Sequence, residues 1–282
     1  MPRIFDFGGR DVERSLTVAG LRALKGAGRQ AAQVTAETAD EAAAAEAAGV
    51  EMVVCRAGNV GRVREGSRHV FVTAALGFAE AVTPDEILRA AFSAITGGAD
   101  AVLTSRGSET VRALAAEQIP VVGHLGFVPR KSTWVGAVRA VGKTAAEALE
   151  LWYRFRRLED AGAFAVECEL IAAPVMAEIH RRTSLVTISL GSGPEADVMF
   201  LFTSDICGES SRPPRHARAW GDLAARQEAV RDERLRALKC FRAEVAAKSF
   251  PGCAECADAP PAEVEAFRAR LGPDDRTTLL ST

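Results

Sequence analysis

The sequence carries almost no excess charge, because 35 lysine and arginine residues are balanced by 37 aspartate and glutamate residues, for a net charge of -2. Aromatic residues make up 6% of the chain and no basic stripe runs between them, so neither nucleic acid nor an anionic membrane surface is an expected partner. The chain also lacks an apolar segment after Met1 and any uninterrupted run of about eighteen apolar residues. We therefore expect a cytoplasmic protein, without a membrane segment, that acts on small molecules.

Cysteine is sparse, and the absence of a secretory signal predicts reduced thiols rather than a disulfide framework. Cys253 and Cys256 alone have the spacing of a metal or redox pair. A structural zinc site normally needs four ligands, and no second close pair follows, so an ordinary pair in a loop or tail is favoured over zinc. The six cysteines are Cys55, Cys168, Cys207, Cys240, Cys253 and Cys256.

Short apolar or β-branched runs alternate with alanine-rich helical stretches through most of the 282 residues. Such alternation is typical of βαβ units around a parallel sheet. We count about eight candidate strands, the number that closes a (β/α)8 TIM-type barrel, with an open doubly wound sheet as the alternative. The candidates are residues 32–34, 51–55, 70–73, 101–103, 120–122, 163–168, 185–190 and 198–202.

The pattern changes after the last candidate strand, which predicts additional C-terminal helices beyond the barrel. Residues 220–248 read as a long, charged, amphipathic helix with no strand after it, expected to pack outside the barrel or on a partner subunit. We predict a single barrel domain over residues 1–250, including this outer helix. Residues 251–282 should form a tail or arm with one short helix at 262–271.

Three stretches resemble ketopantoate hydroxymethyltransferase, a family within the phosphoenolpyruvate mutase and isocitrate lyase superfamily of barrels. They read IPVVGHLGFVP at 119–129, EDAGAFA at 159–165 and GSGPEAD at 191–197, and the similarity covers most of the chain from Leu16 onward. The resemblance implies a barrel assembled as a homo-oligomer, usually a decamer. It also implies transfer of a one-carbon unit from methylenetetrahydrofolate to the enolate of 3-methyl-2-oxobutanoate, a 2-oxo acid held by magnesium.

The sequence departs from the family at its metal ligands. The family's Asp-Ser pair falls on Arg56 and Ala57, and its second metal-binding aspartate falls on Ala75. Its Lys-x-Glu motif falls on residues 103–105, Leu-Thr-Ser, so the substrate-facing lysine is also missing. Magnesium needs oxygen ligands, so we expect no metal ligands of the ordinary kind here.

Two functional positions of the family are kept. His124 stands where the resemblance places an active-site histidine, and Glu169 where it places the glutamate that removes the substrate proton. Both should lie at the C-terminal ends of strands, the catalytic face of such barrels. Glu167 lies two residues before Glu169 and should share its face of the strand. Neighbouring carboxylates oppose each other's ionisation, which suits a glutamate base near neutral pH.

Two arginines are candidates to replace the missing metal. Arg56 would place a fixed positive charge where the family binds magnesium, and Arg106 follows the altered Lys-x-Glu motif. The alternative is that either arginine pairs with Glu167, Glu169 or Glu109 and fills the emptied cavity.

Ser105 and Thr104 complete the candidate substrate-binding residues, as polar residues on the rim of the pocket. These residues support two functions. The first is an altered enzyme of the family, a one-carbon transferase or carbon–carbon lyase that acts on a small 2-oxo acid. The second is a non-catalytic barrel that serves as a scaffold or regulatory subunit, because a fold can outlast its chemistry.

Overall fold

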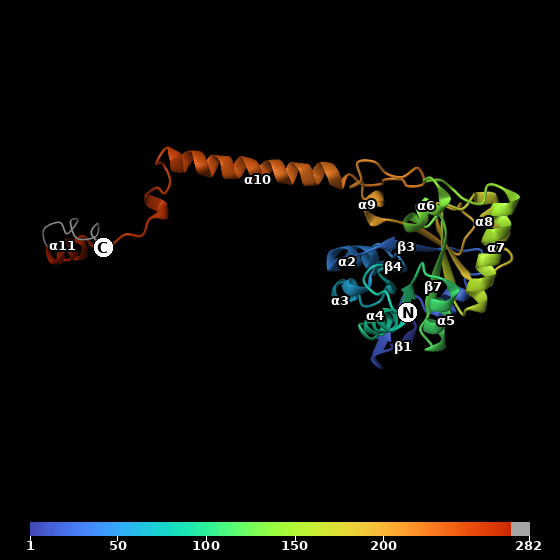
Figure 1. The fold of residues 1–282 in the computed structure, drawn as a ribbon. Helices are drawn as coiled ribbons and strands as arrows, with labels where there is room; N and C mark the ends of the chain where they lie inside the picture. Colours follow the sequence, from blue (N-terminus) through green and yellow to red (C-terminus); the bar gives the residue numbers. More distant parts are fainter. Residues whose placement is uncertain (272–282) are drawn as a thin grey trace. The chain divides into compact units, whose positions relative to one another are not determined.

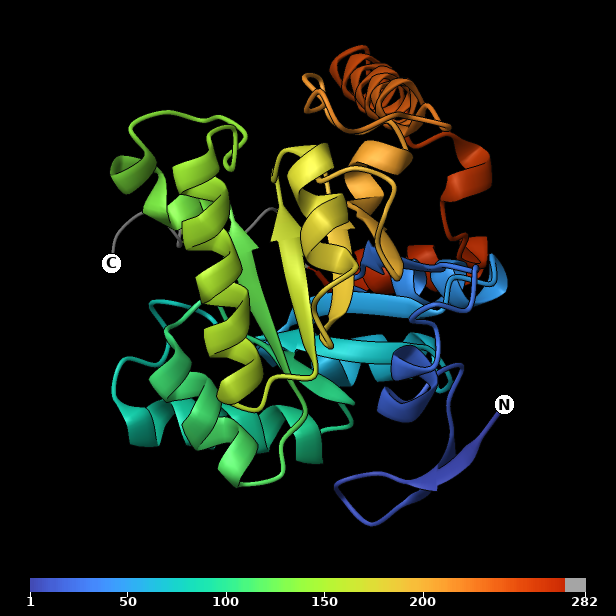
Figure 2. The ribbon, with the colours of Figure 1, turned by 90° about the vertical axis from the view of Figure 1, so that its right-hand side faces the viewer.

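Eight parallel strands close into a barrel in the computed structural model, which describes residues 1–271 (Figures 1 and 2). The strands follow one another around the barrel in sequence order, and the last pairs with the first, which confirms the TIM-type prediction and excludes an open sheet. Each strand overlaps one that the sequence predicted. They are β3 (Ala31–Thr35), β4 (Met52–Arg56), β5 (Phe71–Ala75), β6 (Ala101–Leu103), β7 (Val121–Gly126), β8 (Ala165–Glu169), β9 (Val186–Leu190) and β10 (Val198–Leu201).

Helices cover the outside of the barrel, as Figure 2 shows. Their ends follow sequence signals: Thr83 caps α4 by accepting the N–H of Glu86, whose side chain returns the contact in a capping box. The helices are α1 (Val18–Arg22), α2 (Ala39–Ala47), α3 (Val60–Gly66), α4 (Pro84–Thr96), α5 (Ser108–Ala116), α6 (Ser132–Val135), α7 (Ala145–Asp160), α8 (Ala173–His180) and α9 (Thr203–Ile206), with short 3-10 turns at Ala57–Asn59 and Pro129–Lys131.

Alternation along the strands separates two hydrophobic layers. Met52, Val54 and Phe71 belong to a cluster inside the barrel. Val53 and Val72, one position away, belong to a second cluster between the strands and the helices. Positions that continue the inner face to the C-terminal strand ends therefore reach the mouth of the barrel.

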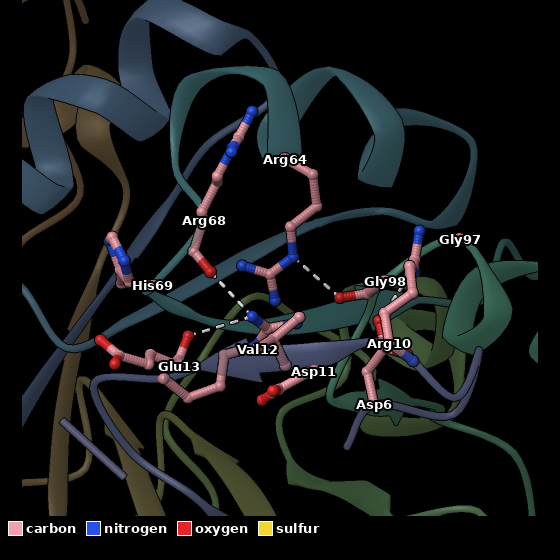
Figure 3. Close-up of a pocket in the computed structure, with 11 residues that line it drawn as sticks. Asp6, Arg10, Asp11, Val12, Glu13, Arg64, Arg68, His69, Gly97 and Gly98 are labelled. Atoms are coloured by element: carbon pink, nitrogen blue, oxygen red, sulfur yellow. Dashed lines mark hydrogen bonds and ion pairs between the residues drawn. The ribbon is translucent and has the colours of Figure 1, made fainter. Parts of the chain in front are cut away.

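A hairpin that the sequence analysis missed lies ahead of the barrel. Its strands, β1 (Arg3–Phe5) and β2 (Asp11–Glu13), pair antiparallel. Directly after it, Arg14 forms an ion pair with Asp100, just before β6, and Arg64 binds the other carboxylate oxygen. Figure 3 shows this end of the barrel, a cavity of about 440 Å³ at the N-terminal ends of the strands. Three of its arginines, Arg10, Arg14 and Arg64, donate to carbonyl oxygens and carboxylates of the protein.

The chain divides at Leu223 into two compact units, and the second unit begins at Ala224. Helix α10 (Leu223–Ala246), close to the predicted helix, lies in the second unit except for its first residue, and a 3-10 turn at Cys253–Glu255 and α11 (Pro261–Arg270) follow. No residue of α10 is buried. The expected packing of this helix and the domain boundary at residue 250 stay predictions, and residues 272–282 of the expected tail lie outside the described part. Within residues 1–271, no helix combines the length and the apolarity needed to cross a bilayer.

Candidate active site

The histidine and glutamates singled out in the sequence meet at the mouth of the barrel. β7 and β8 are neighbours, and their register pairs His124 with Glu167 and Gly126 with Glu169. His124 Nε2 lies 2.9 Å from Glu169 Oε2 and 3.8 Å from Glu167 Oε1. The side chains of His124 and Glu169 are 12% and 13% exposed, so both are largely withdrawn from water but still reachable. The predicted convergence of an imidazole and a strand-end carboxylate is present.

The backbone around Glu169 is held in an unusual shape. Gly126 has a φ of +99°, and a Cβ there would lie 2.1 Å from the carbonyl oxygen of Glu169. This close approach lets the N–H of Phe127 donate to the same oxygen at 2.7 Å. Leu170, directly after Glu169, has a φ of 49°, a left-handed conformation that is rare for leucine. A strained backbone persists only where surrounding contacts hold it, and such strained positions are found most often at functional sites.

Protonation in the trio favours a cationic imidazole. Burial lowers the pKa of His124, but the hydrogen bond to Glu169 and the charges of both glutamates outweigh burial, and the pKa lies above the ordinary value. Burial raises the pKa of Glu167, and the charge of Glu169 raises it further against the opposing charge of His124. The arrangement therefore favours a proton on His124, whose Nε2–H donates to Glu169.

We expect the raised pKa of His124 to make the barrel less stable as pH rises. The folded state binds this proton more tightly than the unfolded chain, so its contribution is complete below the ordinary imidazole pKa and disappears as pH rises through the folded pKa. Urea denaturation between about pH 6 and pH 8.5 should show a falling free energy of unfolding. In His124→Gln the slope should be shallower. An equal slope in both proteins would contradict the shift.

Arg56 and His124 line one cavity of about 200 Å³, together with Ser105. Within residues 1–271 the guanidinium of Arg56 has no ion pair; the contact at this residue runs from its backbone N–H to Glu37. Glu169 is bound to His124 instead of Arg56. The cavity therefore holds a guanidinium that forms no ion pair with any residue that the structure describes, although the carboxylate of Glu80 is also among its lining groups.

Arg106 occupies a different place from Arg56. Its guanidinium donates to the carbonyl oxygens of Phe78 and Ala81, which fastens the loop between β5 and α4, and it lies over the Phe78 ring. Like Arg56, it forms no ion pair with a glutamate in the described part of the chain, contrary to the pairing alternative. Thr104 is 1% exposed and its hydroxyl accepts the N–H of Arg106, so it lies behind the pocket wall instead of on the rim that we expected.

Four positively charged side chains near the mouth of the barrel were not predicted from the sequence. Arg130 lines the cavity of Arg56, and three others line a neighbouring cavity of about 250 Å³ that also touches His124. A partial signal existed, because residues 150, 154 and 157 recur at helical spacing and so share one face of α7. Nothing in the sequence showed which loops that face would meet. The three are Lys131, Arg154 and Arg157.

A magnesium ion of the ordinary family type does not fit the strand ends where the resemblance places it. There Arg56 pairs in register with Ala75, and neither side chain offers an oxygen ligand. Within residues 1–271 one trio of candidate ligands has its ligand atoms within 4.8 Å of one another: His124, Glu167 and Glu169. One imidazole and two carboxylates suit zinc, manganese or iron better than magnesium. The absence of metal ligands from the site therefore stays a prediction. No third ligand of this kind joins Cys253 and Cys256 within the same residues.

Comparison with known families and proteins agrees with the resemblance. The family model described as ketopantoate hydroxymethyltransferase matches residues 56–253. A 3-methyl-2-oxobutanoate hydroxymethyltransferase of Hyperthermus butylicus is 41% identical over 176 residues, which cover 61% of this chain and 58% of that protein. One of Pyrococcus furiosus is 35% identical over 174 residues, with 61% and 59% covered. The chain thus spans about three fifths of the length of the curated relatives that it matches.

Solved structures at low identity share the fold. A 2,3-dimethylmalate lyase, described as a PEP mutase/isocitrate lyase superfamily member, superposes with a TM-score of 0.50 at 14% identity and covers 91% of this chain and 100% of its own. A carboxyl transferase domain of Rhizobium etli pyruvate carboxylase gives a TM-score of 0.51 at 12% identity, over 69% of this chain and 43% of its own. These likenesses support the barrel and nothing finer.

Proposed function

The chain belongs to the ketopantoate hydroxymethyltransferase family, and from that membership we propose that it deprotonates a small 2-oxo acid and adds a one-carbon unit to the enolate. The observation that carries the proposal is the contact between His124 and Glu169 beside a cavity that Arg56 also lines. The substrate that the family suggests is 3-methyl-2-oxobutanoate, and the suggested one-carbon donor is methylenetetrahydrofolate.

Glu169 is the proposed base. Its carboxylate takes the proton from the carbon next to the carbonyl, and the electron pair of that C–H bond moves to form the enolate. Negative charge then develops on the carbonyl oxygen, where fixed positive groups stabilise it more than they stabilise the ground state. The imidazolium of His124 and the guanidinium of Arg56 are the groups placed to do so. Water releases the one-carbon unit of the donor as formaldehyde, which breaks the two C–N bonds of the methylene carbon and leaves tetrahydrofolate. The enolate carbon finally bonds to the formaldehyde carbon, and the formaldehyde oxygen takes the proton held by Glu169 and becomes the hydroxyl.

Proton exchange tests this proposal without the one-carbon donor. In deuterated water the enzyme should replace the hydrogen at carbon 3 of 3-methyl-2-oxobutanoate by deuterium, which proton NMR follows as loss of that signal. The measurement should be made with and without added divalent ions, because the trio of His124, Glu167 and Glu169 offers metal ligands. Absence of exchange for several 2-oxo acids under both conditions would favour the scaffold hypothesis.

We expect Arg56→Met to slow this exchange by about 100-fold, the usual cost of removing one group that stabilises an oxyanion. Arg56→Lys should recover part of the loss, because it restores the charge but not the fork of donors. Arg62→Met is the matched control, since Arg62 is an exposed arginine on α3. Equal rates in Arg56→Met and the control would show that another cation stabilises the enolate.

The remaining family properties are also proposals for this chain. We propose a homo-oligomer, measurable by light scattering of the full chain. The hypothesis of a non-catalytic scaffold loses its strongest expected support, because Glu169 is bonded to His124 and not to Arg56.

A further inference from the structure

We propose that the cavity formed by α5 and α7 beside His124 is a binding site for a doubly charged oxyanion group, a phosphate or a dicarboxylate. This cavity, called the cationic pocket below, has a volume of about 250 Å³. It is separate from the cavity of Arg56, although His124 lines both. The inference does not depend on the proposed function, because it concerns binding by other side chains.

The charges of the cationic pocket are not balanced by the protein. Four cations line it, and Glu150 is the acidic residue among its lining residues. Glu150 already forms an ion pair with Arg157 at 3.1 Å. The cations are Arg106, Lys131, Arg154 and Arg157.

The strongest support for the inference is that Arg154 has no partner in the described part of the protein. Its guanidinium is partly buried on α7, yet within residues 1–271 it has no hydrogen bond or ion pair. Burial lowers the pKa of Arg154, and so does the charge of Arg157, against the opposing charge of Glu150. Burial also lowers the pKa of Lys131, and the charge of Arg154 adds to this effect. Like charges held together with unused donors are stabilised when an anion binds between them.

Other groups around the pocket have donors to spare. The Nε of Arg106 is buried without a partner. Lys131 donates one of its three hydrogens, to the carbonyl oxygen of Ser105 at 2.9 Å. α5 begins at the pocket, and its N-cap is Gly107, which has no side chain to occupy the first backbone N–H groups. The end of a helix that is uncapped in this way favours negative charge, in the same sense as the four cations.

The number of positive charges in the pocket indicates the class of ligand. A single carboxylate would leave most of the positive charge unpaired, whereas a phosphate or a pair of carboxylates would neutralise two cations at once. Either group would lie next to His124. The cationic pocket is therefore suited to the anionic end of a ligand, held beside the proposed catalytic imidazole.

Binding of inorganic phosphate to the full chain tests the inference. Isothermal titration calorimetry at low ionic strength should give saturable binding to the wild-type protein, and Arg154→Met should weaken it by about tenfold or more. Arg154→Lys should restore part of the affinity. Arg89→Met is the control, because Arg89 is an exposed arginine on α4 away from the pocket. Glutarate, titrated in parallel, distinguishes a dicarboxylate from a phosphate preference.

Saturable binding of either anion that Arg154→Met weakens and Arg89→Met does not would support the inference, and the tighter anion identifies the group. The inference is overturned if neither anion saturates the wild-type protein, or if both variants bind as the wild type does. Circular dichroism and the thermal midpoint of Arg154→Met will show whether a loss of binding reflects unfolding. Because no 2-oxo acid is present, this result stands whether or not the exchange assay succeeds.

Discussion

Glu169→Gln should lower the rate of deuterium exchange into 3-methyl-2-oxobutanoate by a factor of about 100 to 10,000, the range found when a positioned general base is lost. The amide has nearly the same shape as the carboxylate and can still accept a hydrogen bond from His124, now at 2.9 Å from Glu169. It cannot accept the substrate proton. The loss should therefore appear in the rate of exchange more than in the affinity for the 2-oxo acid, measured by NMR titration.

The matched control is Glu117→Gln, because Glu117 is an exposed glutamate at the end of α5. It should exchange at the wild-type rate. Glu167→Gln distinguishes the two glutamates of the strand. Glu167 is 5% exposed and lies 3.8 Å from His124, against 2.9 Å for Glu169, so we expect a smaller loss than for Glu169→Gln. Exchange in Glu169→Gln at the wild-type rate would remove Glu169 as the base.

Asp100→Ala should cost about 3–5 kcal/mol of folding free energy, the usual cost of leaving a buried charge without its partner. The side chain of Asp100 is 8% exposed and binds Arg14 at 2.7 Å and Arg64 at 2.6 Å. It also accepts the backbone N–H of Val72 at 2.8 Å. Removal of the carboxylate leaves two arginine charges without a counter-charge and the N–H of Val72 without this acceptor, while both arginines keep carbonyl oxygens as acceptors. Urea denaturation followed by circular dichroism measures the change.

Asp160→Ala serves as the control, since Asp160 is exposed at the end of α7 and should change the free energy by less than about 0.5 kcal/mol. Asp100→Asn should fall between the two, because the amide keeps one acceptor oxygen. A loss below about 1 kcal/mol in Asp100→Ala would mean that water or another acceptor replaces the carboxylate.

The barrel was predictable because its signals are local. Short apolar runs marked all eight strands, and the sequence from Thr83 to Glu86 marked the start of α4 before any packing was known. The hairpin of β1 and β2 was missed because each strand has three residues and alternates around one half-buried side chain. Such a short pattern differs little from a loop.

The candidate site was predictable where it depended on strand ends. The resemblance named His124 and Glu169, the spacing of two added Glu167 on the same face of β8, and the register of β7 with β8 brings the three together. The cationic pocket depends instead on how the turn that carries Lys131 lies against the helix that carries Arg154. A sequence pattern does not show how close these two elements come. The prediction that Thr104 lies on the rim was wrong for a related reason. The strand β6 ends at Leu103, and the next side chain is buried, where its hydroxyl accepts the backbone N–H of Arg106.

The ion pairs of Asp100 lie at the opposite ends of the strands from His124, so the molecule separates the groups that keep it folded from those proposed to react. A substitution near Asp100 should change how many molecules are folded at a given temperature, without changing what each folded molecule does. Conversely, the loops at the mouth can accumulate substitutions, including ones that replace a metal ligand by an arginine. The stability supplied by the ion pairs of Asp100 at the opposite end limits how destabilising such substitutions can be before the barrel unfolds. Such a division lets the chemistry of a barrel drift over evolutionary time without loss of its shape.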